Sequence, residues 1–146
     1  MITFGTRVFE NVKDKEIVHF GKFKIRGLCV ADTVLLHGSG SGDWVVGDTC
    51  LILAAGRLVR LKRVDCVKAF LLGLRGRVVV DAVSAELVVS KKAVVGNLRA
   101  ETAVFGQETL VGSVESRRAV FLDPHVWFKN EPSINVVEYR YSVTGE

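Results

Sequence analysis

Residues 94–113 read VVGNLRAETAVFGQETLVGS, and the beginning of this stretch returns at its end. Val94-Val95-Gly96-Asn97 is followed sixteen positions later by Leu110-Val111-Gly112-Ser113, with a further apolar pair, Ala103-Val104, between the two copies. Self-similarity at a fixed period is the signature of a repeat architecture. The stretch therefore indicates one turn of a longer periodic structure.

The same period extends over most of the chain. The polar residue that follows Val-Val-Gly belongs to a column with steps of 16 or 17 residues: Asp32, Asp48, Asp65, Asp81, Asn97 and Ser113. Two positions earlier the column reads Val30, Val46, Arg63, Val79, Val95 and Val111. Each period carries about three short apolar segments, separated by small or polar corner residues, and lacks the longer apolar stripe of a helix.

Apolar segments of two or three residues cannot bury a face alone, but stacked turns of chain can. Each strand then bonds to its equivalents in the turns above and below, about 4.8 Å away, and the inward side chains form ladders. The sequence therefore predicts an all-β, single-domain parallel β-helix of about seven coils of roughly 16 residues, right-handed, with an atypical C-terminal cap.

The clarity of the repeat divides this single domain into three parts. Residues 1–27 are expected to form an N-terminal coil or cap, 28–122 the β-solenoid core, and 123–146 a C-terminal cap. Pro124 and Pro132 interrupt the pattern in the last part, which also holds Trp127, Phe128 and Tyr139. A cap is expected because the open end of a solenoid exposes unpaired strand edges.

The composition favours a cytoplasmic protein. Hydrophobic residues make up 49% of the 146 positions, yet the apolar runs are far shorter than the roughly 18–20 residues of a membrane span. The start, MITFGTRVFENVKDKE, lacks the pattern of a secretory signal. The formal net charge of +4 is only mildly basic.

The three cysteines, Cys29, Cys50 and Cys66, lie among apolar residues and form no C-x-x-C pair. Their chemistry could in principle serve as a nucleophile or as a metal ligand. We expect them to be small buried thiols in a reducing cytosol instead.

One sequence pattern recurs: V-x-G, then a polar residue, an apolar residue, x-A-x-x and an apolar residue. It is found in VVGNLRAETAVFGQETLVGSVES (94–116) and, more loosely, in LRGRVVVDAVSAELVVS (74–90). In this pattern the chain resembles the bactofilins, polymer-forming cytoskeletal proteins of bacteria, over about residues 28–122. The resemblance implies a non-catalytic structural protein whose main partner is itself. Because bactofilins often carry a short membrane-binding motif, it also implies association with the membrane surface or a cell-envelope component.

Self-assembly is expected to use the ends of the rod, without nucleotide and without a cofactor, since strand edges and apolar ladders are open there. The expected contact residues are Val18, Phe20, Phe23 and Ile25 at one end, and Val126, Trp127, Phe128, Val136 and Val137 at the other. A tight aromatic cap at the C-terminal end would instead give a dimer or a monomer.

An alternative function is a binding or scaffold module with a basic face. The run RLVRLKR (57–63) alternates basic and apolar residues, and further cations follow it. The face would consist of Arg60, Lys62, Arg75, Arg77, Lys91 and Lys92 and would suit an anionic polymer, lipid or protein. Aromatic residues that stack on bases are not interleaved there, so no specific nucleic acid partner is predicted.

Two chemical hypotheses are weaker. The column of aspartates could hold calcium, but Asn97 and Ser113 at equivalent positions favour carboxylates that accept hydrogen bonds within corner turns. His37, beside GSGSGD (38–43), is the sole candidate base for an acyltransferase-like enzyme, which would be a trimer. Large residues at Leu53, Val59 and Leu71 break the hexapeptide pattern of those enzymes. No catalytic or metal site is therefore predicted.

Overall fold

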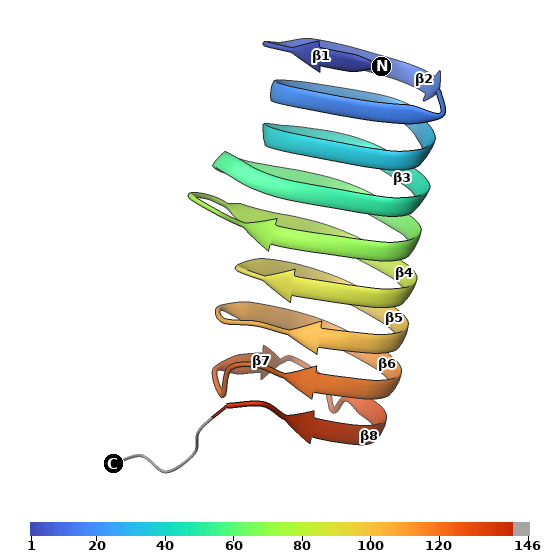
Figure 1. The fold of residues 1–146 in the computed structure, drawn as a ribbon. Coiled ribbons are helices and arrows are strands. Elements are labelled where there is room, and N and C mark those ends of the chain that lie inside the picture. Colours follow the sequence, from blue (N-terminus) through green and yellow to red (C-terminus); the bar gives the residue numbers. More distant parts are fainter. Residues whose placement is uncertain (142–146) are drawn as a thin grey trace.

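The chain winds around one axis as a solenoid of about nine turns. In the computed structural model, which describes residues 1–141, all the secondary-structure elements are β-strands. The strands are β1 (Ile2–Phe4), β2 (Arg7–Lys13), β3 (Glu16–Gly73), β4 (Arg77–Lys91), β5 (Ala93–Phe105), β6 (Thr109–Phe121), β7 (Val126–Phe128) and β8 (Ser133–Tyr139). On the near side of Figure 1 the chain runs from right to left, and it returns behind while it descends, which is the right-handed sense.

All strand pairs are parallel and join one coil to the next. β1 and β2 pair with β3, the chain of pairs continues through β4, β5 and β6, and β6 pairs with β7 and β8. β3 is 58 residues long because it passes several corners without leaving the sheet. The predicted parallel β-solenoid with a spacing of about sixteen residues is confirmed.

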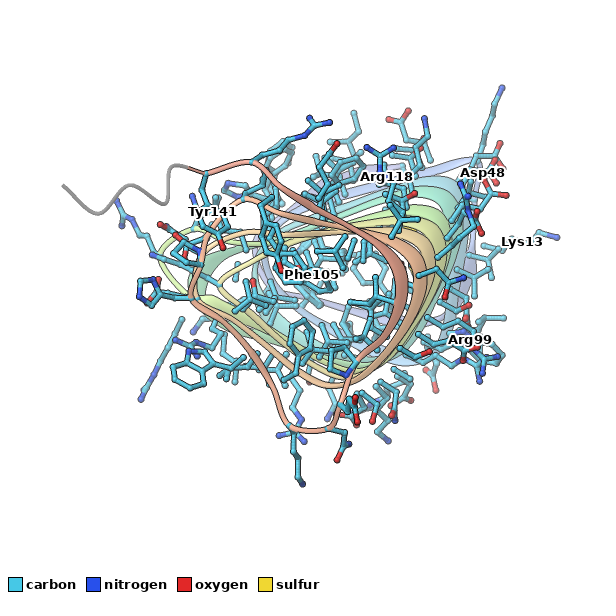
Figure 2. All side chains as sticks on the ribbon, turned by 90° about the horizontal axis from the view of Figure 1, so that it is seen from below. Lys13, Asp48, Arg99, Phe105, Arg118 and Tyr141 are labelled. Atoms are coloured by element: carbon cyan, nitrogen blue, oxygen red, sulfur yellow. A yellow bond between two sulfur atoms is a disulfide. The ribbon has the colours of Figure 1, made fainter. Side chains whose placement is uncertain are left out.

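Each coil has three faces, separated by corners at which the strand register is interrupted. Figure 2, viewed along the axis, shows the coils superposed, with Phe105 inside and Lys13, Asp48 and Arg99 projecting outward. The first face contains residues 77–80, 93–95, 109–111 and 126–128, the second contains 82–85, 97–100 and 113–116, and the third contains 87–91, 102–105, 118–121 and 136–139.

The core consists of side-chain ladders that run parallel to the axis. One ladder on the first face passes through Leu61, Val80, Val95, Val111 and Phe128, each paired with the next. The first four of these side chains are almost completely buried. The apolar segments of the sequence thus find in neighbouring coils the cover that one coil cannot provide.

Glycine in the Val-Val-Gly motif lets neighbouring coils approach closely at a corner. A Cβ atom at Gly96 would lie 2.5 Å from the carbonyl oxygen of Asp81, and one at Gly112 would lie 2.4 Å from that of Gly96. Both distances are shorter than van der Waals contact allows. The motif is therefore required by the stacking of the coils.

The number of coils is larger than the seven predicted, because both termini continue the winding. At the N-terminus Ile2 pairs with Val18 and Phe9 pairs with Ile25. At the other end Val137 pairs with Ala119. The last residues of the expected C-terminal cap, 142–146, lie outside the described residues.

The predicted register is wrong on both sides of the coil that contains Val79. The sequence columns aligned Arg63 with Val79, whereas Arg60 pairs with Val79 and Leu61 with Val80, nineteen positions later. The turn at residues 74–76 accounts for the longer step, and the next coil is shorter, since Val80 pairs with Val95. Insertions at a corner thus change the spacing without interrupting the ladder.

The same shift separates the aspartates of the predicted column. Asp65 pairs with Ser84, and Asn97 pairs with Ala82, so the carboxylates of Asp65 and Asp81 do not belong to one ladder. The Asp65 carboxylate accepts hydrogen bonds from Trp44 Nε1 and Arg63 Nε, both at 2.6 Å. Residues 1–141 contain no group of three His, Cys, Asp or Glu side chains that could hold a metal ion.

We expect Gly96→Ala to lower the free energy of unfolding by about 1–3 kcal/mol, the usual cost of overpacking, because the new methyl group meets a backbone oxygen. Asn97→Ala, an exposed position in the same corner, is the matched control and should change it by less than about 0.5 kcal/mol. Urea denaturation measures both values. Equal stability of the two variants would contradict the close approach of the coils.

Candidate functional site: the ends and basic surfaces of the solenoid

The C-terminal end of the solenoid exposes the end of its core. The inward positions of the last coil are occupied by Val126, Phe128, Ile134, Val137 and Tyr139, which pair with inward residues of β6. No further coil of the described chain covers them, and Tyr139 is 63% exposed. Together with Phe121, Asp123, Tyr141 and the two prolines, these side chains line an open cavity of about 440 Å³.

An aromatic cluster forms the floor of this cavity. The rings of Phe105 and Phe121 lie 5.3 Å apart, and Tyr139 stacks on Phe121 at 5.5 Å between centroids. Phe128 meets Phe105 and Phe121 edge-on, at 5.5 and 6.0 Å. Offset and edge-to-face contacts of this kind add to the stabilisation that the aromatic cluster gains from burial.

The five residues predicted at this end divide between two sides of the coil. Val126, Phe128 and Val137 face the core and line the cavity. Trp127 and Val136 pair with the outward residues Leu110 and Arg118, and they are 65% and 50% exposed.

The sequence reasoning missed Ile134 and Tyr139 as members of this end surface. The spacing of Phe105, Phe121 and Tyr139 could have revealed Tyr139, because the two steps of 16 and 18 residues are close to one coil. The prolines in between concealed this continuation of the repeat.

The four residues predicted at the N-terminal end do not lie at the end. Phe23 and Ile25 are buried in the second coil, beneath Arg7 and Phe9 of the first. Val18 and Phe20 also lie in the second coil, paired with Ile2 and Phe4, on the outer side of the third face. Residues 1–27 were expected to form one N-terminal coil or cap, whereas residues 1–13 already form a coil that lies over these four residues.

At the true N-terminal end, polar groups lie at or over the inward positions of the first coil. The guanidinium of Arg7 lies 5.3 Å from the centroid of the Phe9 ring and covers it. Thr3 Oγ1 is 2.7 Å from Nδ1 of the buried His19, whose Nε2 donates a hydrogen bond to the carbonyl of Lys22. The N-terminal ammonium donates to the carbonyl of Glu16 at 2.8 Å. The two ends therefore present different chemistry.

The residues of the predicted basic face gather around two features of the rod, a notch and a turn. Arg60 and Lys62 line a notch of about 210 Å³ together with Lys24, Arg26 and the small residues Ser41 and Gly42. Asp43 lies in the same notch, 3.2 Å from Lys62 Nζ. The backbone N–H of Gly27 and the ammonium of Lys62 hold the pKa of Asp43 below its ordinary value, so this carboxylate neutralises one of the four cations.

The second basic group surrounds the turn at residues 74–76. Arg75 lies in this turn, Arg77 begins β4, and Lys91 and Lys92 follow one coil later. Lys92 Nζ contacts the carbonyl of Leu74 at 3.4 Å and the carboxylate of Glu108 at 3.9 Å. Arg60 pairs with Val79, two residues from Arg77 in the next coil, so the two groups adjoin each other on the first face.

His37, the candidate base of the enzyme hypothesis, is half-buried on the outer surface. Its ring lies 5.4 Å from that of Phe20. This contact is ordinary aromatic packing, and the neighbouring segment 38–43 remains within β3.

The expectation of three free thiols is wrong for two of them. Cys50 and Cys66 form a disulfide between neighbouring coils, with their Cα atoms 6.3 Å apart. Their separation of sixteen residues is one coil, and this spacing could have revealed the pair. Cys29 is a free thiol in the core, and burial raises its pKa to about 11.

Comparison of this chain with protein-family models, with curated proteins and with solved structures finds no match. Residues 1–141 contain no helix long and apolar enough to cross a membrane. The ends and the basic surfaces of the solenoid are therefore the features that bear on function.

Thiol labelling tests the state of the cysteines. In the folded protein we expect no modification by iodoacetamide at pH 7.5, because Cys29 is buried and protonated. Denaturation without reductant should allow one label, and denaturation with reductant should allow three. Mass spectrometry of the intact protein counts the labels, and three labels without reductant would contradict the disulfide.

Proposed function

We propose that this protein is a non-catalytic structural protein that assembles into filaments through the ends of its solenoid, without nucleotide. This is the behaviour implied by its resemblance to the bactofilins, the polymer-forming cytoskeletal proteins. The observation that carries the proposal is the open C-terminal end, where inward apolar side chains of the last coil are left uncovered in an open cavity.

The backbone at the ends supports the proposal independently of the side chains. Among the described strands, β7 and β8 pair only with β6, and β1 and β2 pair only with β3. One edge of each terminal coil therefore carries N–H and C=O groups that point away from the rod. Such edges are templates for pairing with another chain.

A second solenoid end satisfies both requirements at once. It supplies strand edges with the same spacing and apolar side chains that continue the ladders. The two ends are chemically different, because Arg7 covers Phe9 at one end and Tyr139 remains exposed at the other. Contact between unlike ends repeats without closing, and this is the geometry of a filament.

A pair of neighbouring residues tests this proposal. Val137→Asp places a carboxylate among the inward apolar side chains that line the cavity, whereas Val136→Asp places it on the outer side of the same strand. Both side chains are similarly exposed, at 44% and 50%. We expect negative-stain microscopy to show filaments for the unmodified protein and for Val136→Asp, and none for Val137→Asp. Filaments of all three proteins, or of none, would contradict end-to-end assembly.

The basic notch favours a second candidate function, a scaffold that binds an anionic partner. Lys24, Arg26 and Arg60 gather around the small floor residues Ser41 and Gly42. Such a site suits the phosphate or carboxylate groups of a polymer, and its affinity should fall steeply with salt. Salt-sensitive binding to heparin without filaments at any salt concentration would favour this function over the first.

A further inference from the structure

The third face of the solenoid is apolar on its outer side as well as on its inner side. In the segment Cys50–Ala54 the buried Cys50, Ile52 and Ala54 alternate with Leu51 and Leu53, which face outward. The same alternation recurs in other coils. We define the outer apolar face as Ile2, Phe4, Val18, Phe20, Leu35, Leu51, Leu53, Phe70, Leu72, Leu87, Val89 and Val104.

The outer apolar face is continuous along the rod. At its upper end Phe4 stacks on Phe20 at 5.5 Å, and His37 lies next to Phe20. Further down, Phe70, Val89 and Val104 pair in one column. The face corresponds to the near side of Figure 1.

Charged groups mark where this surface stops. Below Val104, Glu138 binds Arg118 at 3.0 Å and Arg140 at 2.8 Å. Lys68 and Lys91 lie at the sides, next to Leu87 and Leu72 in the strand pairing. An apolar centre with a charged rim is the composition of a protein interface.

The second face shows that apolar outer surfaces are not a general property of this rod. Its outward residues include Ser84, Asn97, Arg99, Ser113 and Glu115, and Arg99 pairs with Glu115 at 3.2 Å. Strands that are apolar on both sides are typical of sheets covered on both sides. The third face therefore lacks its cover in the isolated chain.

We propose that a second copy of this chain covers the outer apolar face, so that two solenoids lie side by side with parallel axes. Sheets pack face to face about 10 Å apart, and the rungs of a second solenoid have the same spacing as those of the first. Parallel axes place the apolar coils of one copy against those of the other. Antiparallel axes would instead place the Arg118–Glu138 end of each copy against Phe4 or Phe20 of the other.

The size of the surface fits a paired rod. About seven coils at 4.8 Å and strands of about five residues at 3.3 Å give a flat footprint of roughly 550 Å² per copy. The relief of the side chains adds to this area. The total area buried by the two copies therefore approaches the 1,200 Å² or more of a stable interface. This side contact does not depend on the end contact proposed above.

The test uses Val137→Asp as a background, because this variant is expected to lack filaments. Analytical ultracentrifugation should give it twice the mass of one chain. Adding Phe70→Lys or, separately, Leu53→Lys should weaken the dimer by at least about 100-fold, because both copies carry the change. Leu58→Lys, at a 42% exposed leucine of the first face, is the matched control and should leave the dimer intact.

Both Lys substitutions lie on the outer side, and circular dichroism verifies that each variant retains its fold. A monomeric Val137→Asp protein at 100 µM, or equal weakening by Leu58→Lys, would overturn the proposed pairing. If Val137→Asp still forms filaments, the proposed end contact is wrong. The side-by-side pairing is then tested by measuring the mass per length of those filaments. Phe70→Lys should then halve that mass per length, and an unchanged value would overturn the pairing.

Discussion

Each coil of this solenoid depends on the coils above and below it, because sixteen residues arranged in three short strands cannot bury their apolar side chains alone. Hydrogen bonds and apolar side chains both find their partners one coil away, as in the ladder from Leu61 through Val80 to Val95. In the interior of the rod this requirement is met from both sides. At the two ends it is met from one side only, and the structure of the ends therefore determines how the molecule meets others.

The two ends respond to this constraint differently. At the N-terminus, Arg7 lies over Phe9, and a buried histidine and a threonine replace apolar residues at the inward positions. At the C-terminus the ladders of inward side chains end at Phe128 on the first face and at Tyr139 on the third, and a cavity remains. The sides of the rod differ as well, since charges cover the second face and leucine, valine and phenylalanine cover the third. End contacts would lengthen an assembly and side contacts would widen it, so the two surfaces have separable roles.

The regular middle of the chain was predictable from the sequence because the repeat there has one simple physical cause. Gly96 and Gly112 are needed where backbones approach, and valine recurs wherever a side chain enters a ladder. The register between Leu61 and Val80 was not predictable in the same way, because a turn at a corner absorbs extra residues without disturbing the core. The N-terminal coils were expected only as a single coil or cap, because polar Thr3 and His19 occupy inward positions there and weaken the apolar pattern. The Cys50–Cys66 bridge becomes evident only when the spacing of sixteen residues is interpreted as one coil.

The most direct test of the central claim is the axial repeat of the assembled protein. If terminal coils stack on those of the next molecule as coils stack within the chain, about nine turns at 4.8 Å give an axial repeat of roughly 43 Å. Cryo-electron microscopy of the purified protein without nucleotide measures this repeat. The account predicts filaments with a repeat close to that value and an unbroken 4.8 Å spacing across the junction. Particles that remain single at all salt concentrations, or filaments whose strand spacing is interrupted at each junction, would contradict it.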